Sequence, residues 1–296
     1  MSKNQTVLLA VTSLLLMGTS ARADLKVVSL ATLSGLPDAV KAQAPALAAP
    51  VTTTTYYKGA LQRIESVGGV TILGADGAML TLDPAARTYY RTASGAPSPA
   101  AGNPLMSMFK IDGKATVTPT ALKKTLLGRE VSQYTIAATL NLSMNGGDPS
   151  MASMFPTINL TGRQWTTESI KTLPTAGLMP AGLFTGSLPI PGFDSVKSLA
   201  SEMGKIKGFP LETGATVTFV FPKDSPLIGM VGDTLPSKVT FQSTVTAISE
   251  AALPDDLFTV PAGYKQVDSP KAPGIAPTVP GIPGTASTAV PPVPPA

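Results

Sequence analysis

The chain has 296 residues, with 22 Lys and Arg against 18 Asp and Glu, and its formal charge is +4 at pH 7. It contains neither His nor Cys, so it lacks the usual proton shuttle near neutral pH, thiolate chemistry, disulfides and the commonest nitrogen and sulfur ligands of transition metals. Its basic residues are scattered with few aromatic residues beside them, so we expect no nucleic-acid partner.

Residues 1–23 resemble a cleavable secretory signal. Lys3 precedes an apolar run from Val7 to Met17, and an Ala-Arg-Ala sequence ends at Ala23. We therefore expect cleavage after Ala23 and a mature protein in the periplasm, free or peripheral to the outer membrane. Loss of one Lys and one Arg with the signal leaves 20 basic and 18 acidic residues, a net charge of +2. No later run approaches the roughly 20 apolar residues of a membrane-spanning helix, so we expect no transmembrane segment after signal removal.

Residues 24–50 form an Ala- and Pro-rich lead. Pro37, Pro45 and Pro50 interrupt it, and proline ends or prevents regular helices. We expect at most one short helix here, at Asp38–Gln43, and assign the lead no function.

The main domain is expected over residues 51–267, and it opens with a meander of short antiparallel strands. Gly68-Gly69 and Asp76-Gly77 separate successive β-branched or aromatic runs, and both dipeptides accept the positive φ angles of tight turns. The predicted strands are Thr52–Tyr57, Leu61–Val67, Val70–Leu73 and Ala78–Leu82.

Three later segments alternate apolar and polar residues, which is typical of strands with one buried face. In the first, Tyr134 and Ile136 fall on the apolar face, while Gln133 and Thr135 fall on the face expected to meet water. The predicted strands are Gln133–Leu142, Ala215–Phe221 and Val239–Ala247.

An amphipathic helix is predicted at Ser195–Lys207. Asp194 is a suitable N-cap, and Gly208 a suitable C-terminal stop. Such a helix would cover the apolar face of the sheet. Its apolar positions, at helical spacing, are Val196, Leu199, Ala200, Met203 and Ile206.

The last segment, residues 268–296, is rich in proline and almost uncharged. Such a composition favours extended conformations and offers no pattern that can pack. We expect a disordered tail, with a spacer or docking segment as the alternative.

Methionine and phenylalanine cluster outside the predicted strands. Flexible Met side chains in irregular segments suit a surface that repacks around varied apolar ligands, but they also fill irregular cores. Both interpretations stay open. The clusters are Met106, Met108 and Phe109; Met144, Met151, Met154 and Phe155; and Leu178, Met179, Leu183 and Phe184.

The sequence carries no catalytic motif. The carboxylates show no spacing that implies a shared cleft, and no nucleophile elbow or supported Ser-x-x-Lys sequence occurs. Asp255-Asp256 lacks the flanking oxygen ligands of a calcium loop. We therefore expect a protein that is not an enzyme, with no catalytic residues, no cofactor and no metal site. Thioether coordination of Cu(I) and a hydrolase built on a carboxylate pair or a Ser-Lys pair remain as weaker alternatives.

Several short blocks together resemble an uncharacterised bacterial exported-domain family, itself similar in fold to the LolA/LolB lipoprotein carriers. The blocks are Tyr57-Lys58-Gly59, Gln62-Arg63-Ile64-Glu65, Leu80-Thr81-Leu82-Asp83, Tyr89-Tyr90, Leu127-Gly128-Arg129-Glu130, Gln164-Trp165-Thr166, Lys207-Gly208-Phe209-Pro210-Leu211 and Leu257–Tyr264. The resemblance covers roughly residues 51–267. It implies a mainly β (α+β) fold, in which a curved antiparallel sheet forms an incomplete LolA-like half-barrel over one or more helices, with an apolar cavity between them.

These observations predict a non-enzymatic periplasmic protein that binds an apolar ligand, a lipid or an acyl chain, between sheet and helix. The alternative is an envelope scaffold or interaction protein with a filled core and an envelope protein as its partner. The candidate cavity residues are Tyr134, Ile136, Trp165, Met179, Phe184, Leu199, Met203, Phe219 and Phe241.

Overall fold

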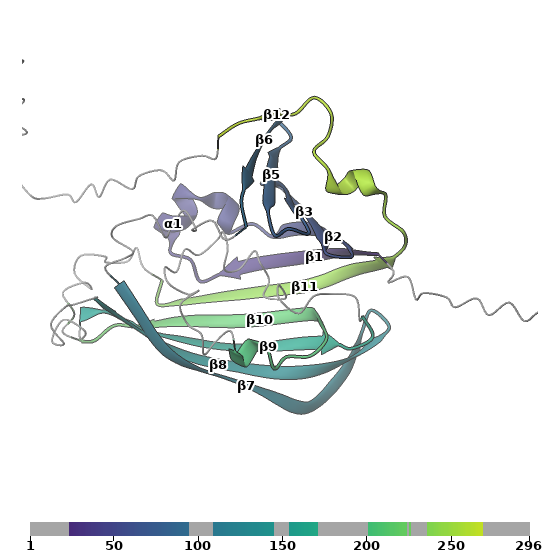
Figure 1. Ribbon diagram of the computed structural model, residues 1–296. Coiled ribbons are helices and arrows are strands. Elements are labelled where there is room, and N and C mark those ends of the chain that lie inside the picture. Colours follow the sequence, from purple (N-terminus) through teal and green to yellow (C-terminus); the bar gives the residue numbers. More distant parts are fainter. Residues whose placement is uncertain are drawn as a thin grey trace, which may run out of the picture.

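The protein is a mainly β structure built on one open sheet of twelve strands (Figure 1). The computed structural model describes residues 24–94, 109–144, 154–170, 201–223, 225 and 236–268. In spatial order the strands are β12-β6-β5-β4-β3-β2-β1-β11-β10-β9-β8-β7. Neighbours pair antiparallel except β12 and β6, which run parallel. Their bounds are β1 Leu25–Ser34, β2 Val51–Lys58, β3 Leu61–Ser66, β4 Gly69–Leu73, β5 Met79–Asp83, β6 Thr88–Thr92, β7 Phe109–Leu126, β8 Arg129–Met144, β9 Thr157–Thr167, β10 Phe209–Val220, β11 Lys238–Glu250 and β12 Lys265–Gln266.

The sheet is bent. Six long strands lie side by side in the order β1, β11, β10, β9, β8 and β7, and this layer curls at β8 and β7 (Figure 1). The short strands β3 to β6 rise out of the layer. Irregular pairing contributes to the bend, because bulges increase local twist and curvature. The register shifts between Pro119 and Lys123 of β7, and between Pro210 and Glu212 of β10.

Strand β1 corrects the expectation of a lead with at most one helix. Leu25–Ser34 pairs with β2 on one side and β11 on the other, so it lies in the middle of the sheet. Leu25 and Val27 are 1% and 4% exposed, and burial of these side chains drives the segment into the sheet. The short helix was predicted correctly: α1 spans Asp38–Gln43 and is followed by a 3-10 turn, η1, at Pro45–Leu47.

The predicted meander is confirmed by strands β2 to β5, and the predicted turns lie where expected. Gly69 and Gly77 have φ angles of 131° and 75°, which only glycine adopts without strain. The side chain of Asp76 accepts a hydrogen bond of 2.9 Å from the N–H of Ala78 and so closes the second turn. The three alternating segments are likewise strands, in β8, β10 and β11, although β10 ends at Val220, one residue before the predicted end.

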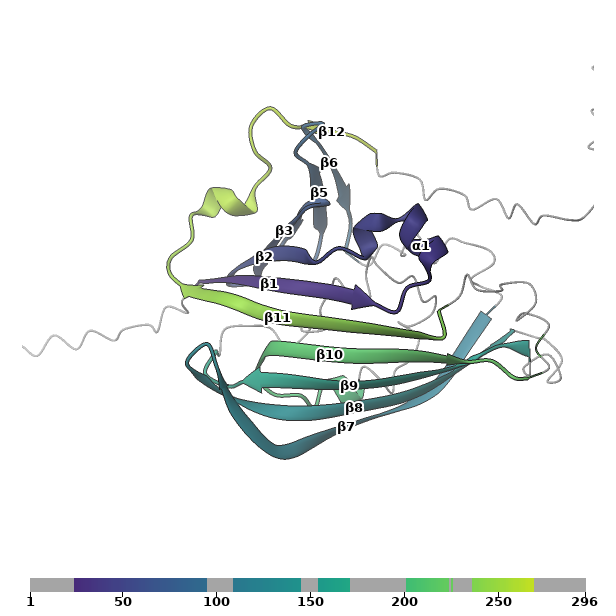
Figure 2. The same cartoon turned by 180° about the vertical axis from the view of Figure 1, so that it is seen from behind.

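The predicted helix at Ser195–Lys207 is described only from Ser201 onward. Residues 201–203 are helical and a turn follows, and no helix in the described part of the chain reaches seven residues. This helical turn lies in front of β8 and β9 in Figure 1 and behind them in Figure 2, so it covers one face of the sheet.

Candidate functional site

The face of the sheet under the helical turn is apolar over three strands. Residues paired directly across antiparallel strands share a face, and the register of β8, β9 and β10 therefore defines successive rows. We call this surface the apolar face. Its rows are Tyr134–Gln164–Thr213, Ile136–Gly162–Ala215, Ala138–Leu160–Val217 and Leu140–Ile158–Phe219.

The apolar face is the centre of a packed cluster. Leu140 is 0% exposed, and Met203 and Ile206 of the covering segment, residues 201–207, pack against its neighbours. Burial of these side chains is the main favourable term that holds the covering segment on the sheet. The buried members are Val117, Tyr134, Ile136, Ala138, Leu140, Ile158, Leu160, Ile206 and Val217.

Two polar contacts attach the covering segment to the sheet. The backbone N–H of Val117 in β7 donates a hydrogen bond of 3.0 Å to Oε2 of Glu202, and the N–H of Lys207 donates one of 3.4 Å to the hydroxyl of Tyr134. Glu202 also pairs with Lys205. The hydrogen bonds from Lys205 and from the Val117 N–H lower the pKa of Glu202, so its carboxylate stays ionised and accepts from the sheet edge.

The structure brings four of the predicted cavity residues together. Tyr134 and Ile136 belong to the buried cluster, and Met203 and Phe219 pack against it half-buried. Phe241 of β11 pairs with Ala215 and so continues the same face. The other candidates are placed as follows: Trp165 packs in a separate cluster, while Met179, Phe184 and Leu199 lie outside the described residues.

Trp165 lies beneath a lysine from the far edge of the sheet. Nζ of Lys124 in β7 is 4.3 Å from the centroid of the Trp165 ring and 2.6 Å from Oε2 of Glu212 in β10. A cation over an indole face and an ion pair both favour this placement. Lys124 of β7 thus reaches across β8 to side chains of β9 and β10, and this contact links three strands of the curled part of the sheet.

Buried polar side chains are the feature that sequence patterning missed. Gln133, expected on the wet face, is 8% exposed, because Thr120 from the bulged part of β7 covers it and donates a hydrogen bond to its backbone oxygen. Gln164 and Thr213 are 2% and 7% exposed on the apolar face. Alternation alone predicts solvent for such residues, and only the pairing of distant strands reveals their burial.

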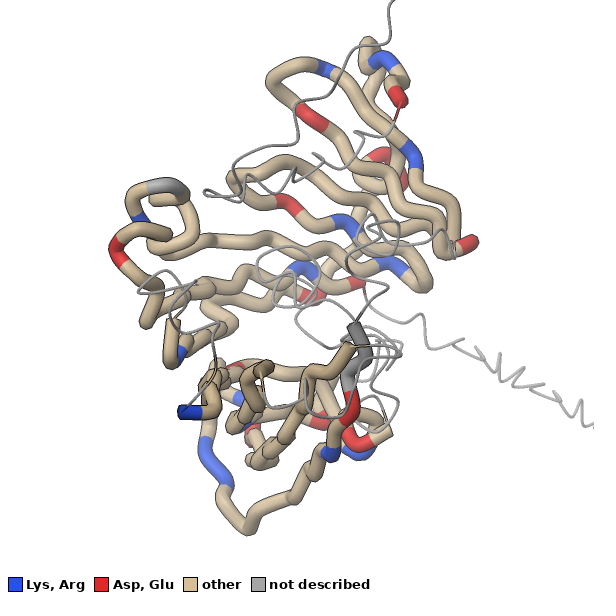
Figure 3. The backbone as a smooth tube through the Cα atoms, turned by 90° about the vertical axis from the view of Figure 1, so that its left-hand side faces the viewer, with Lys and Arg blue, Asp and Glu red and all other residues tan. Residues whose placement is uncertain are grey.

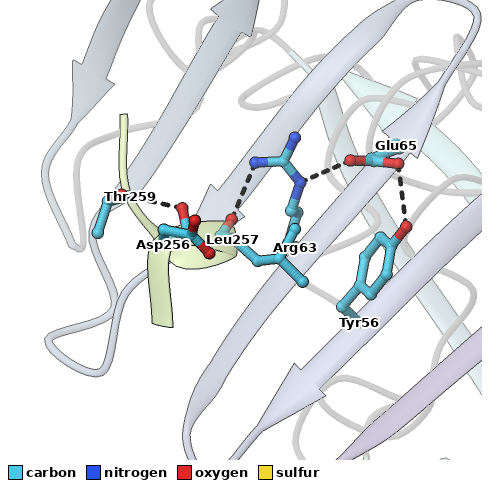
Figure 4. Close-up of polar contacts among 6 residues, drawn as sticks. All are labelled: Tyr56, Arg63, Glu65, Asp256, Leu257 and Thr259. Atoms are coloured by element: carbon cyan, nitrogen blue, oxygen red, sulfur yellow. Dashed lines mark hydrogen bonds and ion pairs between the residues drawn. The ribbon is translucent and has the colours of Figure 1, made fainter. Parts of the chain in front are cut away.

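The residues after β11 form a strap that lies beside Arg63 of β3 (Figure 4). Its 3-10 turn, η5 (Asp255–Phe258), places Phe258 in a cluster with Val70, Ile72 and Leu82. Nη1 of Arg63 donates a hydrogen bond of 2.9 Å to the carbonyl oxygen of Leu257.

A second polar group holds the start of the strap. Lys58 pairs with Asp255 at 2.8 Å and donates to the carbonyl of Leu253, whose N–H donates a hydrogen bond of 2.8 Å to Asp24. These carboxylates are thus occupied by a lysine and by backbone groups, which is a structural arrangement rather than an acid–base pair.

Charges of both signs are interspersed along the backbone (Figure 3). Within the described ranges, no group of three or more Asp and Glu is arranged to hold a metal ion. The same ranges contain no helix that is both long and apolar enough to cross a bilayer.

No protein-family model matches the chain, and no curated protein matches it.

Proposed function

We propose that this is an exported, non-enzymatic protein that binds an apolar ligand, a lipid or acyl chain, on the apolar face of a LolA-like half-barrel. The observation that carries the proposal is a patch of half-buried large side chains, made of Leu33, Met203, Phe219 and Phe241. Met203 and Phe219 pack against the buried cluster, and Phe241 and Leu33 continue the row of Ala215.

The register supports one continuous patch. Phe241 pairs with Ala215 of β10 and with Leu33 of β1, and Phe219 lies four residues beyond Ala215 on the same strand. All these positions share one face because side chains alternate along a strand. Ligand sites are typically concave and lined by hydrophobic and aromatic side chains. Met203, whose flexible thioether side chain adapts readily to varied shapes, packs against the same buried cluster as Phe219.

The test is ligand binding by mature protein, beginning at Asp24, purified from a periplasmic fraction. Native mass spectrometry would report co-purifying lipid, and titration with a fluorescent palmitate analogue would report saturable binding. Two matched variants on β11 separate the faces: Phe241→Ser changes the patch, whereas Gln242→Ser changes the exposed neighbour that points to the opposite face.

We expect Phe241→Ser to weaken binding about tenfold, the scale of one lost aromatic contact, and Gln242→Ser to leave it unchanged. A clean apo mass together with no saturable binding would reject the proposal.

A second candidate is an envelope interaction protein with a filled core, and one observation favours it. Val117, Leu140 and Ile206 leave the centre of the cluster at most 6% exposed, so the chain's own side chains already occupy that part of the face. An apo mass with capture of an envelope protein after cross-linking in cells would favour this function.

A further inference from the structure

Gln164 is an unusual residue on the apolar face. Its side chain is buried at 2% exposure, and its Oε1 atom has no hydrogen-bond partner in the described part of the chain. An unpaired buried acceptor costs about 1–3 kcal/mol, and most buried polar groups in folded proteins have partners. The unpaired oxygen therefore calls for an occupant that donates a hydrogen bond.

The surroundings of Gln164 limit the chemistry of that occupant. Across the strands it pairs with Tyr134 and Thr213, and along β9 it is flanked on the same face by Gly162 and Thr166. None of these four neighbours carries a charge, so an ionised headgroup would find no counter-charge among them. An uncharged hydrogen-bond donor fits these surroundings better than an ionised headgroup.

The neighbouring row carries little side-chain volume next to Gln164. Gly162 and Ala215 lie side by side next to Gln164, and together they contribute no side-chain atom beyond one methyl group. Ile136 of the same row and Leu160 and Val217 of the next row belong to the buried cluster, and Phe241 continues the row beyond Ala215. A molecule lying there would meet an amide oxygen at one end and hydrocarbon at the other.

The covering segment makes a weak polar contact with Tyr134, the neighbour of Gln164. The hydrogen bond from the Lys207 N–H to the Tyr134 hydroxyl is 3.4 Å long, at the weak end of the range for such bonds. Separation of the Lys207 backbone from Tyr134 would break only this weak hydrogen bond, while Glu202 stays bonded to Val117 and Ile206 stays in the buried cluster.

We propose that Gln164 Oε1 is the recognition point for the polar end of the ligand, and that this end is an uncharged hydrogen-bond donor, a hydroxyl or amide N–H of a lipid. The inference rests on the proposed function, since it places the ligand's acyl chain along the row Ile136–Gly162–Ala215 toward Phe241 and Leu33 of the patch.

The test compares two probes that share one acyl chain: monoolein, whose glycerol headgroup has free hydroxyls, and methyl oleate, which has an ester but no donor. Wild-type protein should bind monoolein about tenfold more tightly, the scale of one hydrogen bond to an otherwise unpaired buried group. Gln164→Leu should lower the monoolein affinity to that of methyl oleate. Gln242→Leu, at an exposed amide on β11, should keep the wild-type preference.

The outcomes separate the two proposals. If neither probe binds, the proposed function fails. If both bind wild-type protein equally, or if Gln164→Leu keeps the preference, the function stands and the role of Gln164 is overturned. Urea unfolding of the unliganded Gln164→Leu variant should show stability equal to or above that of wild type, because an unpaired acceptor has been removed. A marked loss of stability would mean that the amide is bonded within the fold, which also overturns the inference.

Discussion

Gly208 marks the point at which the covering segment turns into β10, and we predict that Gly208→Ala is strongly destabilising. The φ angle of Gly208 is 84°, and a Cβ atom there would lie 2.5 Å from the carbonyl oxygen of Thr167 in β9. That distance is far below the 3.4 Å at which ordinary van der Waals contact begins, and the obstructing atom belongs to the backbone of a paired strand. It cannot rotate away as a flexible side chain would.

The chain supplies a matched control in Gly128, which joins β7 to β8. Its φ angle is 73°, but a Cβ atom there would meet nothing within 4 Å. A left-handed backbone conformation costs a residue with a Cβ atom about 1 kcal/mol relative to glycine, and this cost applies to both positions. Overpacking against a rigid neighbour adds about 1–3 kcal/mol at Gly208 alone.

We therefore expect Gly208→Ala to lose about 2–4 kcal/mol of unfolding free energy, and Gly128→Ala about 1 kcal/mol. The assay is urea unfolding followed by the fluorescence of Trp165, the single tryptophan of the chain, which lies two residues before Thr167. The comparison is valid if both variants keep the wild-type m value. Equal losses in the two variants would refute the steric part of the reasoning.

Three further predictions concern the strap, the curl of the sheet and a buried phenol. Phe258→Ala should cost about 3–4 kcal/mol and speed hydrogen exchange in β4 and β5, because Phe258 is 7% exposed against those strands; a loss below about 1 kcal/mol would contradict that packing. Glu212→Gln should lower the free energy of unfolding by about 1–2 kcal/mol, a value below that of a fully buried ion pair because the Lys124 and Glu212 side chains are 34% and 27% exposed. It should also shift the fluorescence emission of Trp165. An unchanged spectrum and stability would show that the Lys124 contact is not needed. Burial raises the pKa of Tyr57 to about 12 from 10.0, so the folded state holds this proton more tightly, and the resulting stability is complete below pH 10 and lost as the pH rises toward 12. The unfolding free energy of Tyr57→Phe should therefore fall less with rising pH above pH 10 than that of wild type, and an unchanged pH dependence would count against a buried phenol.

The alternation of apolar and polar residues predicted the strands well where one face is buried and the other is exposed to solvent. The alternation around Tyr134 and Ile136, and again along β11, follows directly from the two-residue period of a strand. The same reasoning failed at Gln133, because the bulged end of β7 covers a face that the pattern assigns to solvent. The bulge lies in the partner strand, so it leaves no mark in the sequence around Gln133.

Strand order required information that no local window contains. Leu25 and Val27 lie in a short apolar run ahead of an Ala- and Pro-rich segment, and their burial depends on two partner strands, β2 and β11. Gln164 was overlooked as a functional candidate for the same reason. Its burial depends on Thr213 of β10, 49 positions along the chain.

The position of β1 also has a consequence for folding. Leu25 pairs with Glu250, and this seam between β1 and β11 is where the meander β2 to β6 joins the long strands β7 to β10. The two parts of the sheet therefore cannot unite until β11 has emerged during synthesis, and contacts between such distant residues are slow to form. A nascent chain, or one truncated before β11, leaves β1 and β10 each with one unpaired edge, able to recruit a foreign strand in place of its missing neighbour.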